Sequence, residues 1–295
     1  MFDLRYHVAS LAAVFLALII GIVVGVGISG KGFVSDSERR VFNERIADLN
    51  QRLDSANRRG AELSRAQRAA QTFVTDAYPV LMERRMTGLH VALVFAGHED
   101  GRIESPVEQA LADGGGDPPL RTRALKLPID LPTLRRALAK RPALAALATK
   151  RRIGELGRRL GASLVAGGDD ALWQILSDEL IEERSGNDKP AVDGVVVVRT
   201  VPPQTGPTAR FLAGFYAGIA ATGVPAVGVE RTNAKSSAVQ AFAKKDLSTV
   251  DDIDTEAGRL ALVLVLGGAS PGQYGVKQTA EDGVLPEILP AAPGG

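Results

Sequence analysis

The sequence of 295 residues has no cysteine, only three histidines and three methionines, and few aromatic residues. The lack of cysteine excludes disulfides, thiolate metal sites and cysteine nucleophiles. Aromatic residues make up 5% of the chain, which disfavours an outer-membrane β-barrel, because such barrels carry aromatic girdles at both membrane interfaces. The net charge of +1 gives no bulk attraction for nucleic acid, so no nucleic acid partner is expected.

Charge is also missing near the N-terminus, where no charged residue occurs from Val8 to Ile28. As an α-helix this run would be about 30 Å long, which matches the hydrocarbon core of a bilayer. We therefore expect residues 1–30 to form a single transmembrane anchor, with the C-terminal domain outside the cytoplasm. A cleaved signal peptide is the alternative, although its apolar core would be shorter, at roughly 7–15 residues.

Within this apolar run, Gly21 and Gly25 are four residues apart. Such spacing lets two helices approach closely in lipid, so it predicts helix dimerisation through this face. The alternative is that the two glycines reflect only the general frequency of glycine in membrane helices.

Residues 31–86 have a different pattern, with apolar residues at alternating spacings of three and four. This heptad pattern is typical of a coiled coil. The expected core positions are Phe42, Ile46, Leu49, Leu53, Ala56, Gly60, Leu63, Gln67, Ala70, Val74, Ala77 and Leu81. We expect a stalk that pairs with a second copy or with a partner helix, weakened in its middle by Gly60 and Gln67. The alternative is an amphipathic helix that folds back on the following domain.

Residues 87–280 alternate short apolar runs with helical stretches, which predicts an α/β domain with a mostly parallel sheet covered on both faces. The expected strands are His90–Gly97, Leu120–Leu127 (exposed or at an edge), Val195–Val201, Pro225–Glu230 and Leu260–Gly267. The expected helices are Glu104–Ala112, Leu134–Leu147, Arg151–Leu160, Ala171–Arg184, Ala209–Thr222 and Ser237–Lys245. Residues 281–295 are rich in proline, glycine and alanine and are expected to be a disordered tail.

The domain contains no complete catalytic motif, so we do not expect an enzyme. His98, Glu99 and Asp100 follow the first expected strand, but a solvated loop explains them best. The glycine-rich segment Gly267–Gly275 lacks the Gly-Lys-Ser/Thr end of a phosphate loop. There is no Gly-x-Ser-x-Gly elbow, and three histidines are too few for a convincing triad.

Two residue clusters contain side chains that could bind a metal ion. Met82, Met86 and His90 are spaced by four, and thioether and imidazole groups are suitable Cu(I) ligands. Gly88 is expected to end the helix before His90, and methionines at this spacing are common core residues. The acidic run from Asp251 to Asp254 is better explained as the entry to a helix.

The N-terminal residues Asp3-Leu4-Arg5-Tyr6-His7-Val8, together with the Gly21-Ile22-Val23-Val24-Gly25 segment, resemble the opening of the actinobacterial MctB family. The resemblance continues through the coiled-coil stretch and the α/β domain to Tyr274-Gly275-Val276-Lys277. It implies an envelope protein of an actinobacterium that is linked to copper export or tolerance and is proposed to form a channel in the outer membrane. Members are also described as SteB-like, partners of a membrane protein called SteA that act in cell separation through a peptidoglycan hydrolase.

The family description and the residues favour different mechanisms. An outer-membrane channel would need eight or more strands of about ten alternating residues, whereas this sequence offers one apolar helix and a soluble domain. Two hypotheses therefore follow: a protein of copper efflux or tolerance, with copper as a transported or sensed ion, or an anchored coiled-coil scaffold that positions a partner protein.

Overall fold

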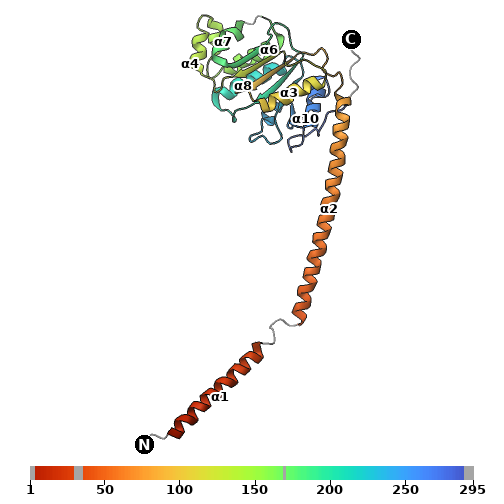
Figure 1. Cartoon of the computed structure of the whole chain (residues 1–295). Coiled ribbons are helices and arrows are strands. Elements are labelled where there is room, and N and C mark those ends of the chain that lie inside the picture. The colour runs from red at the N-terminus through yellow and green to blue at the C-terminus, as the bar shows by residue number, and fades with distance from the viewer. Residues whose placement is uncertain (1–3, 30–35, 169–170, 289–295) are drawn as a thin grey trace. The chain divides into compact units, whose positions relative to one another are not determined.

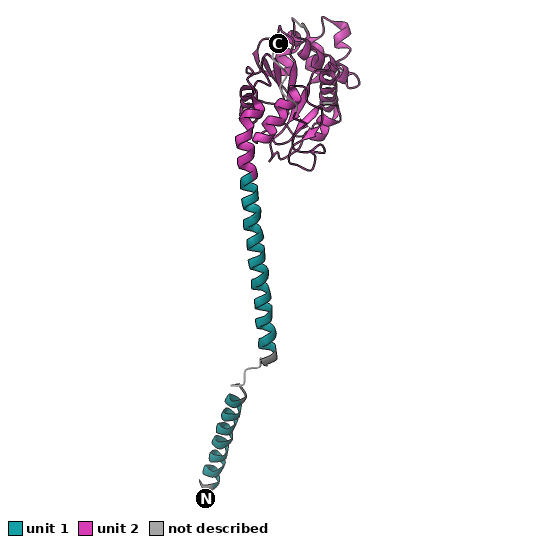
Figure 2. Cartoon of the chain, turned by 90° about the vertical axis from the view of Figure 1, so that its right-hand side faces the viewer, with its two compact units in different colours: residues 1–69 teal, residues 70–295 magenta. Residues whose placement is uncertain are grey.

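The computed structural model describes residues 4–29, 36–168 and 171–288. The chain divides into two compact units, residues 1–69 and residues 70–295 (Figure 2). The last part of the predicted disordered tail, residues 289–295, lies outside the described residues. Within residues 281–288, Leu285 packs against one of the apolar clusters of the α/β domain.

Helix α1 (Leu4–Ser29) contains the expected apolar run. Its segment Tyr6–Gly27 has 22 residues, a mean hydropathy of 2.8 and no burial inside the protein. By length and composition it can cross a membrane once, although a signal sequence has the same properties. The described part of the chain contains no second helix of this kind.

Helix α2 (Asp36–Met82) is continuous over 47 residues and contains Pro79. Its predicted heptad positions Phe42, Leu49, Leu53 and Leu63 are exposed, an arrangement compatible with a coiled coil. Its last turns belong to the second compact unit, where Tyr78 and Met82 are buried. The coiled-coil pairing itself stays a prediction.

In the part of the chain that the structure describes, the α/β domain (Figure 1) is built on one seven-stranded sheet, with the strand order β3-β2-β1-β4-β5-β6-β7. All neighbouring strands are parallel except β2 and β3, which are antiparallel. The mostly parallel sheet predicted from the sequence is therefore confirmed. The strands are β1 (Val91–Ala96), β2 (Arg121–Leu125), β3 (Ile181–Gly186), β4 (Gly194–Arg199), β5 (Ala226–Val229), β6 (Ser248–Val250) and β7 (Gln273–Tyr274).

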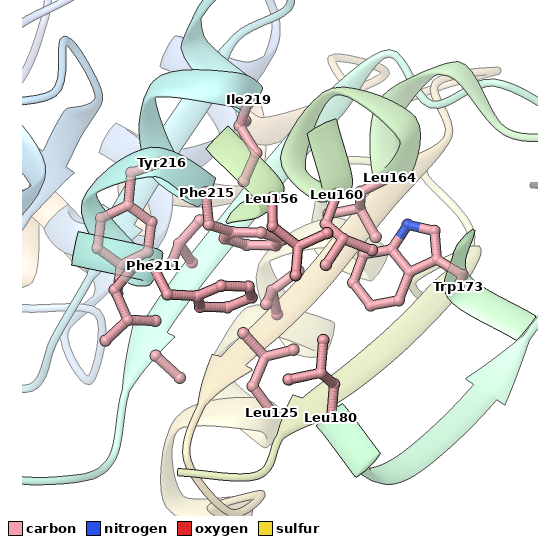
Figure 3. Packing of buried hydrophobic residues seen from close by; sticks show 14 of the residues in the cluster. Leu125, Leu156, Leu160, Leu164, Trp173, Leu180, Phe211, Phe215, Tyr216 and Ile219 are labelled. Carbon is pink, nitrogen blue, oxygen red and sulfur yellow. The ribbon is translucent and has the colours of Figure 1, made fainter. Parts of the chain in front are cut away.

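Helices cover both faces of this sheet, as its continuously apolar strands require. One apolar cluster joins α6 and α8 to alternate residues of β1 and β4, and Figure 3 shows Phe211 and Phe215 of α8 beside Leu156 of α6. The other cluster joins α3, α10 and the end of α2 to the opposite face. The helices are α3 (Gly101–Asp113), α4 (Leu131–Ala137), α5 (Pro142–Ala145), α6 (Ile153–Ala166), α7 (Ala171–Leu180), α8 (Gly206–Ala220), α9 (Val239–Ala243) and α10 (Glu256–Leu266).

The expected strand Leu260–Gly267 is wrong, because this segment belongs to helix α10. Thr255 begins the helix by accepting a 2.9 Å hydrogen bond from the backbone nitrogen of Gly258. Every residue from Leu260 to Leu266 is buried. A helix buried on all sides has no polar stripe, so its sequence pattern is the same as that of a buried strand.

Four other expected elements differ from the structure. The helix predicted for Leu134–Leu147 is divided into α4, which ends at Ala137, and α5, which begins at Pro142. The helix predicted for Ala171–Arg184 ends at Leu180, and the chain continues directly into strand β3. The segment Leu120–Leu127 is not an exposed or edge strand, since β2 is buried and β3 occupies the edge. The predicted helix Ser237–Lys245 is only α9, and the short strands β6 and β7 were not foreseen because two or three residues give no periodicity.

Candidate functional site

The carboxyl edge of the sheet holds a cavity of about 490 Å³. It lies where the chain changes direction across the sheet, because β2 lies on one side of β1 and β4 on the other. Ligands of open α/β sheets bind in this crevice. The cavity is lined by residues that follow β1, β4 and β5, namely Asp100, Arg102, Ile103, Arg199, Thr200, Val201, Pro202, Glu230, Arg231, Asn233, Ala234, Lys235 and Ser236.

Close contact between the first two of these loops shapes the cavity. Gly97 has a φ of +120°, and a side chain there would overlap with Thr200 and Val201. The hydroxyl of Thr200 donates a 2.7 Å hydrogen bond to the carbonyl of His98. The end of β1 is thereby held against the end of β4.

Arg199, the last residue of β4, contributes the most constrained cation. Its Nη2 donates to the carbonyl oxygens of Ser236 at 3.1 Å and Ser237 at 2.7 Å. Its Nε is buried and has no hydrogen-bond partner among the described residues. The guanidinium therefore ties the loop after β5 to β4 and keeps one donor available.

Glu230 follows β5 and is buried with both oxygens in use. Oε1 lies 2.6 Å from the Nζ of Lys277, and Oε2 accepts a 2.7 Å hydrogen bond from the backbone nitrogen of Ala238. The ion pair between Glu230 and Lys277 joins the cavity wall to the Tyr274–Lys277 segment, which resembles the MctB family. Glu230 was not among the residues predicted from the sequence, where the available signal was an acidic residue at the end of an apolar strand.

Asp251, directly after β6, anchors the same segment. Its Oδ1 accepts hydrogen bonds from the backbone nitrogens of Val276 at 2.9 Å and Lys277 at 3.3 Å. The neighbouring Asp252 is fully buried, and burial raises the pKa of its carboxyl. Asp254 accepts from Thr232 at 2.7 Å. The acidic run precedes helix α10, as expected from the sequence, and each member takes part in the packing around that helix entry.

Glu99, which follows β1, interacts electrostatically with the carboxylates of Glu183 and Glu104. Burial and the adjacent Glu183 raise the pKa of Glu99 to about 7, with a further contribution from Glu104. His98, beside Glu99 in sequence, is exposed. The structure thus brings Glu99 together with two glutamates from other elements, rather than with His98 in an acid–base pair.

The structure places the copper candidates Met82, Met86 and His90 in two environments. Both methionine side chains are fully buried in the apolar cluster that contains α3 and α10. The imidazole of His90 is 48% exposed, and its Nδ1 lies 3.5 Å from Asp193. Among the residues that the structure describes, no group of three or more His, Cys, Asp or Glu side chains could hold a metal ion.

The predicted oligomerisation residues lie on the two long helices. A side chain at Gly21 or Gly25 would meet no other atom of the protein within 4 Å. Along α2, the exposed fraction is 69% for Phe42, 45% for Ile46 and 63% for Leu49. Val74, at the last of these positions, is half-buried where α2 enters the second compact unit.

The comparisons with known proteins agree over nearly the whole chain. The family model described as "Copper transport outer membrane protein, MctB" matches residues 1–285. "Copper transporter MctB" of Mycobacterium tuberculosis strain H37Rv is 26% identical over 312 aligned residues, covering 93% of this chain and 96% of the relative. The Mycobacterium leprae protein of the same name is also 26% identical, covering 97% and 100%.

Proposed function

Because this chain belongs to the MctB family, we propose that it is a single-pass envelope protein that contributes to copper efflux or tolerance. The observation that carries the proposal is the family match over residues 1–285, which includes both α1 and the complete sheet. Helix α1 supplies the membrane attachment. The domain after α2 lies outside the cytoplasm in this proposal.

The role of the chain in copper handling is indirect in this proposal. The thioethers of Met82 and Met86 are packed among apolar side chains, so an ion could reach them only if the domain opened. Copper is the transported substrate of the process. The chain would act through the proteins it holds at the membrane.

Gene deletion tests the proposal. A strain that lacks the gene should grow less well at raised copper concentration and hold more copper per cell, and the full-length chain should restore both properties. Complementation with the Met82→Leu and Met86→Leu variant separates an indirect role from direct copper binding by the two thioethers, because leucine keeps the packing but removes the sulfur. An indirect role predicts that this variant restores copper tolerance. Equal copper tolerance with and without the gene would contradict the proposal.

A second candidate function rests on the exposed apolar positions of α2. We propose that α2 pairs with a second copy or with a helix of a SteA-like membrane protein, and that the pair positions a peptidoglycan hydrolase during cell separation. Phe42, Leu49 and Leu63 are each more than half exposed, and burying such positions drives coiled-coil formation. Non-enzymatic scaffolding requires no chemistry from the domain.

Charge substitutions on α2 test the scaffold. The double variant Leu49→Glu and Leu53→Glu should abolish self-association or partner capture, measured by crosslinking of the full chain in its membrane. The control is Gln51→Glu with Ser55→Glu, which adds the same charge at the same spacing on the outer heptad positions. If the first variant associates as well as the control, α2 is not the pairing surface.

A further inference from the structure

A second cavity, of about 240 Å³, lies at the opposite end of β2 from the carboxyl edge. Arg121 and Arg123 of β2 are two residues apart, so their side chains leave the strand on the same face. Trp173 of α7 and Arg184 of β3 line the same space, followed by Asp188 and Lys189 in the turn after β3. Four cationic side chains therefore converge here from segments far apart in the sequence.

The two arginines of β2 are almost completely removed from solvent, each with 2% exposure. Arg121 donates from Nη1 to the carbonyl oxygen of Leu164 at 3.2 Å and from Nη2 to that of Pro190. It has no carboxylate partner among the described residues. Burying a guanidinium without a counter-charge is costly, and carbonyl dipoles do not neutralise it.

Arg123 and Arg184 lie directly opposite each other across the antiparallel pair β2–β3. Like charges in that position repel. Both contact the single carboxylate of Asp188, Arg123 through Oδ1 and Arg184 through Oδ2. Burial, with repulsion from Arg184 and Arg121, lowers the pKa of Arg123 to about 10. One carboxylate is shared where two arginines each need one.

Two hydrogen-bond donors on residues that line this cavity have no partner among the described residues. They are the Nε of Arg121 and the indole Nε1 of Trp173, and both atoms are buried. In Figure 3 the indole nitrogen lies on the side of the ring turned away from Leu125 and Leu180. The hydrogen bond from Arg121 to the carbonyl of Leu164, in α6, gives this buried guanidinium a structural role. It explains neither the two unpartnered donors nor the position of Arg123 opposite Arg184.

We propose that this cavity binds a small oxyanion, a phosphoryl or sulfuryl group, between Arg121, Arg123 and Arg184. Such a group accepts several hydrogen bonds at once and matches the planar fork of arginine. It would supply the negative charge that Arg121, Arg123 and Arg184 lack, since Asp188 is their single carboxylate partner among the described residues. The cavity is smaller than the 300–1,000 Å³ typical of drug-sized ligands, which favours a single anionic group as the bound part.

Trp173 is the only tryptophan in the chain, so its fluorescence reports on this cavity alone. The full-length chain in detergent would be titrated with sodium phosphate at constant ionic strength, with chloride as the balancing anion. We expect a saturable change in fluorescence and a rise in the unfolding temperature with phosphate concentration. Sulfate should compete, and glycerol phosphate tests whether the phosphoryl group of a larger molecule is also accepted.

Two variants and one control keep the result specific. Arg184→Gln, at a side chain that is 41% exposed, should fold and bind phosphate about tenfold more weakly. Arg121→Met should abolish binding. Arg159→Gln on the exposed face of α6 removes the same charge outside the cavity and should bind as the original chain does. If Arg121→Met fails to fold, the comparison of Arg184→Gln with Arg159→Gln decides.

Three outcomes would overturn the proposal. The first is no saturable response to phosphate at constant ionic strength, and the second is equal affinity in Arg184→Gln and Arg159→Gln. The third concerns Asp169 and Asp170, which lie outside the described residues. If phosphate binds only after Asp169→Asn and Asp170→Asn, then carboxylates of the chain itself are the counter-charges of this cavity.

Discussion

The hydroxyl of Tyr78, one turn before the end of α2, donates a 2.8 Å hydrogen bond to the carboxylate of Asp113 at the end of α3. The same hydroxyl accepts a 3.3 Å hydrogen bond from the Nε of Arg259 in α10, whose guanidinium lies 5.5 Å from the centre of the tyrosine ring. Burial raises the pKa of Tyr78 well above its usual value. The end of the long helix is therefore a structural part of the α/β domain.

Removal of this hydroxyl should weaken the attachment of α2. Tyr78→Phe leaves Asp113 and Arg259 without their common partner, and we expect the free energy of unfolding to fall by about 1–3 kcal/mol. Urea unfolding of the full chain measures this change. Val80→Ala on the exposed side of the same helix should change the free energy of unfolding by less than about 0.5 kcal/mol. Equal effects of the two substitutions would contradict a role for the hydroxyl.

The carboxylate of Asp251 should hold the Tyr274–Lys277 segment in place. Asp251→Ala leaves the backbone nitrogens of Val276 and Lys277 without an acceptor, and we expect a loss of about 2–4 kcal/mol. Asp251→Asn keeps one acceptor oxygen and should lose less. Limited proteolysis checks the local effect, because the alanine variant should be cleaved near residue 276 much faster than the asparagine variant. Identical cleavage rates would exclude Asp251 as the anchor.

The raised pKa of Glu99 makes stability depend on pH in a defined direction. The folded state holds a proton on this group up to a pKa of about 7, above the ordinary value of 4.5. The contribution of protonated Glu99 to the free energy of unfolding is therefore present at low pH and is lost as the pH rises from about 4.5 through 7. Glu99→Gln imitates the protonated group, so it should be close to the original chain at pH 5 and more stable at pH 8.

Urea unfolding between pH 5 and pH 8 checks this sign. Glu155 provides the opposite control, because Arg152 and Arg159 lower the pKa of its carboxyl. Glu155→Gln should therefore reduce stability at pH 8, where Glu99→Gln increases it. A constant difference between Glu99→Gln and the original chain across this range would contradict the assignment.

The packing of α6 against α8 should tolerate no side chain at the central glycines. A Cβ atom at Gly214 would overlap with the carbonyl of Gly154, so Gly214→Ala should lower the free energy of unfolding by about 1–3 kcal/mol. Gly60, in the exposed part of α2, has no atom within 4 Å of such a Cβ. Gly60→Ala should instead stabilise its helix by about 0.5–1 kcal/mol, which thermal unfolding followed by circular dichroism can separate.

The local sequence pattern was sufficient to predict the elements that have the same kind of surroundings along their whole length. The uncharged run in α1 and the heptads of α2 follow from composition and period alone. The same holds for β1 and β4, where the runs around Leu93 and Val196 are apolar because parallel strands are covered on both faces. The spacing of apolar residues could not identify α10 as a helix, because complete burial removes the polar face that distinguishes a helix from a strand.

The sequence by itself determined an uncharged run long enough to cross a membrane, a long helix with a heptad pattern and an α/β domain with a mostly parallel sheet. Only the tertiary structure decided where charges meet. In the sequence, Arg121 and Arg123 are typical of an exposed or edge strand. Only the antiparallel pairing of β3 with β2 places Arg184 opposite Arg123. Composition and period are local properties, whereas the electrostatic energy of a side chain depends on distances to groups that are remote in sequence.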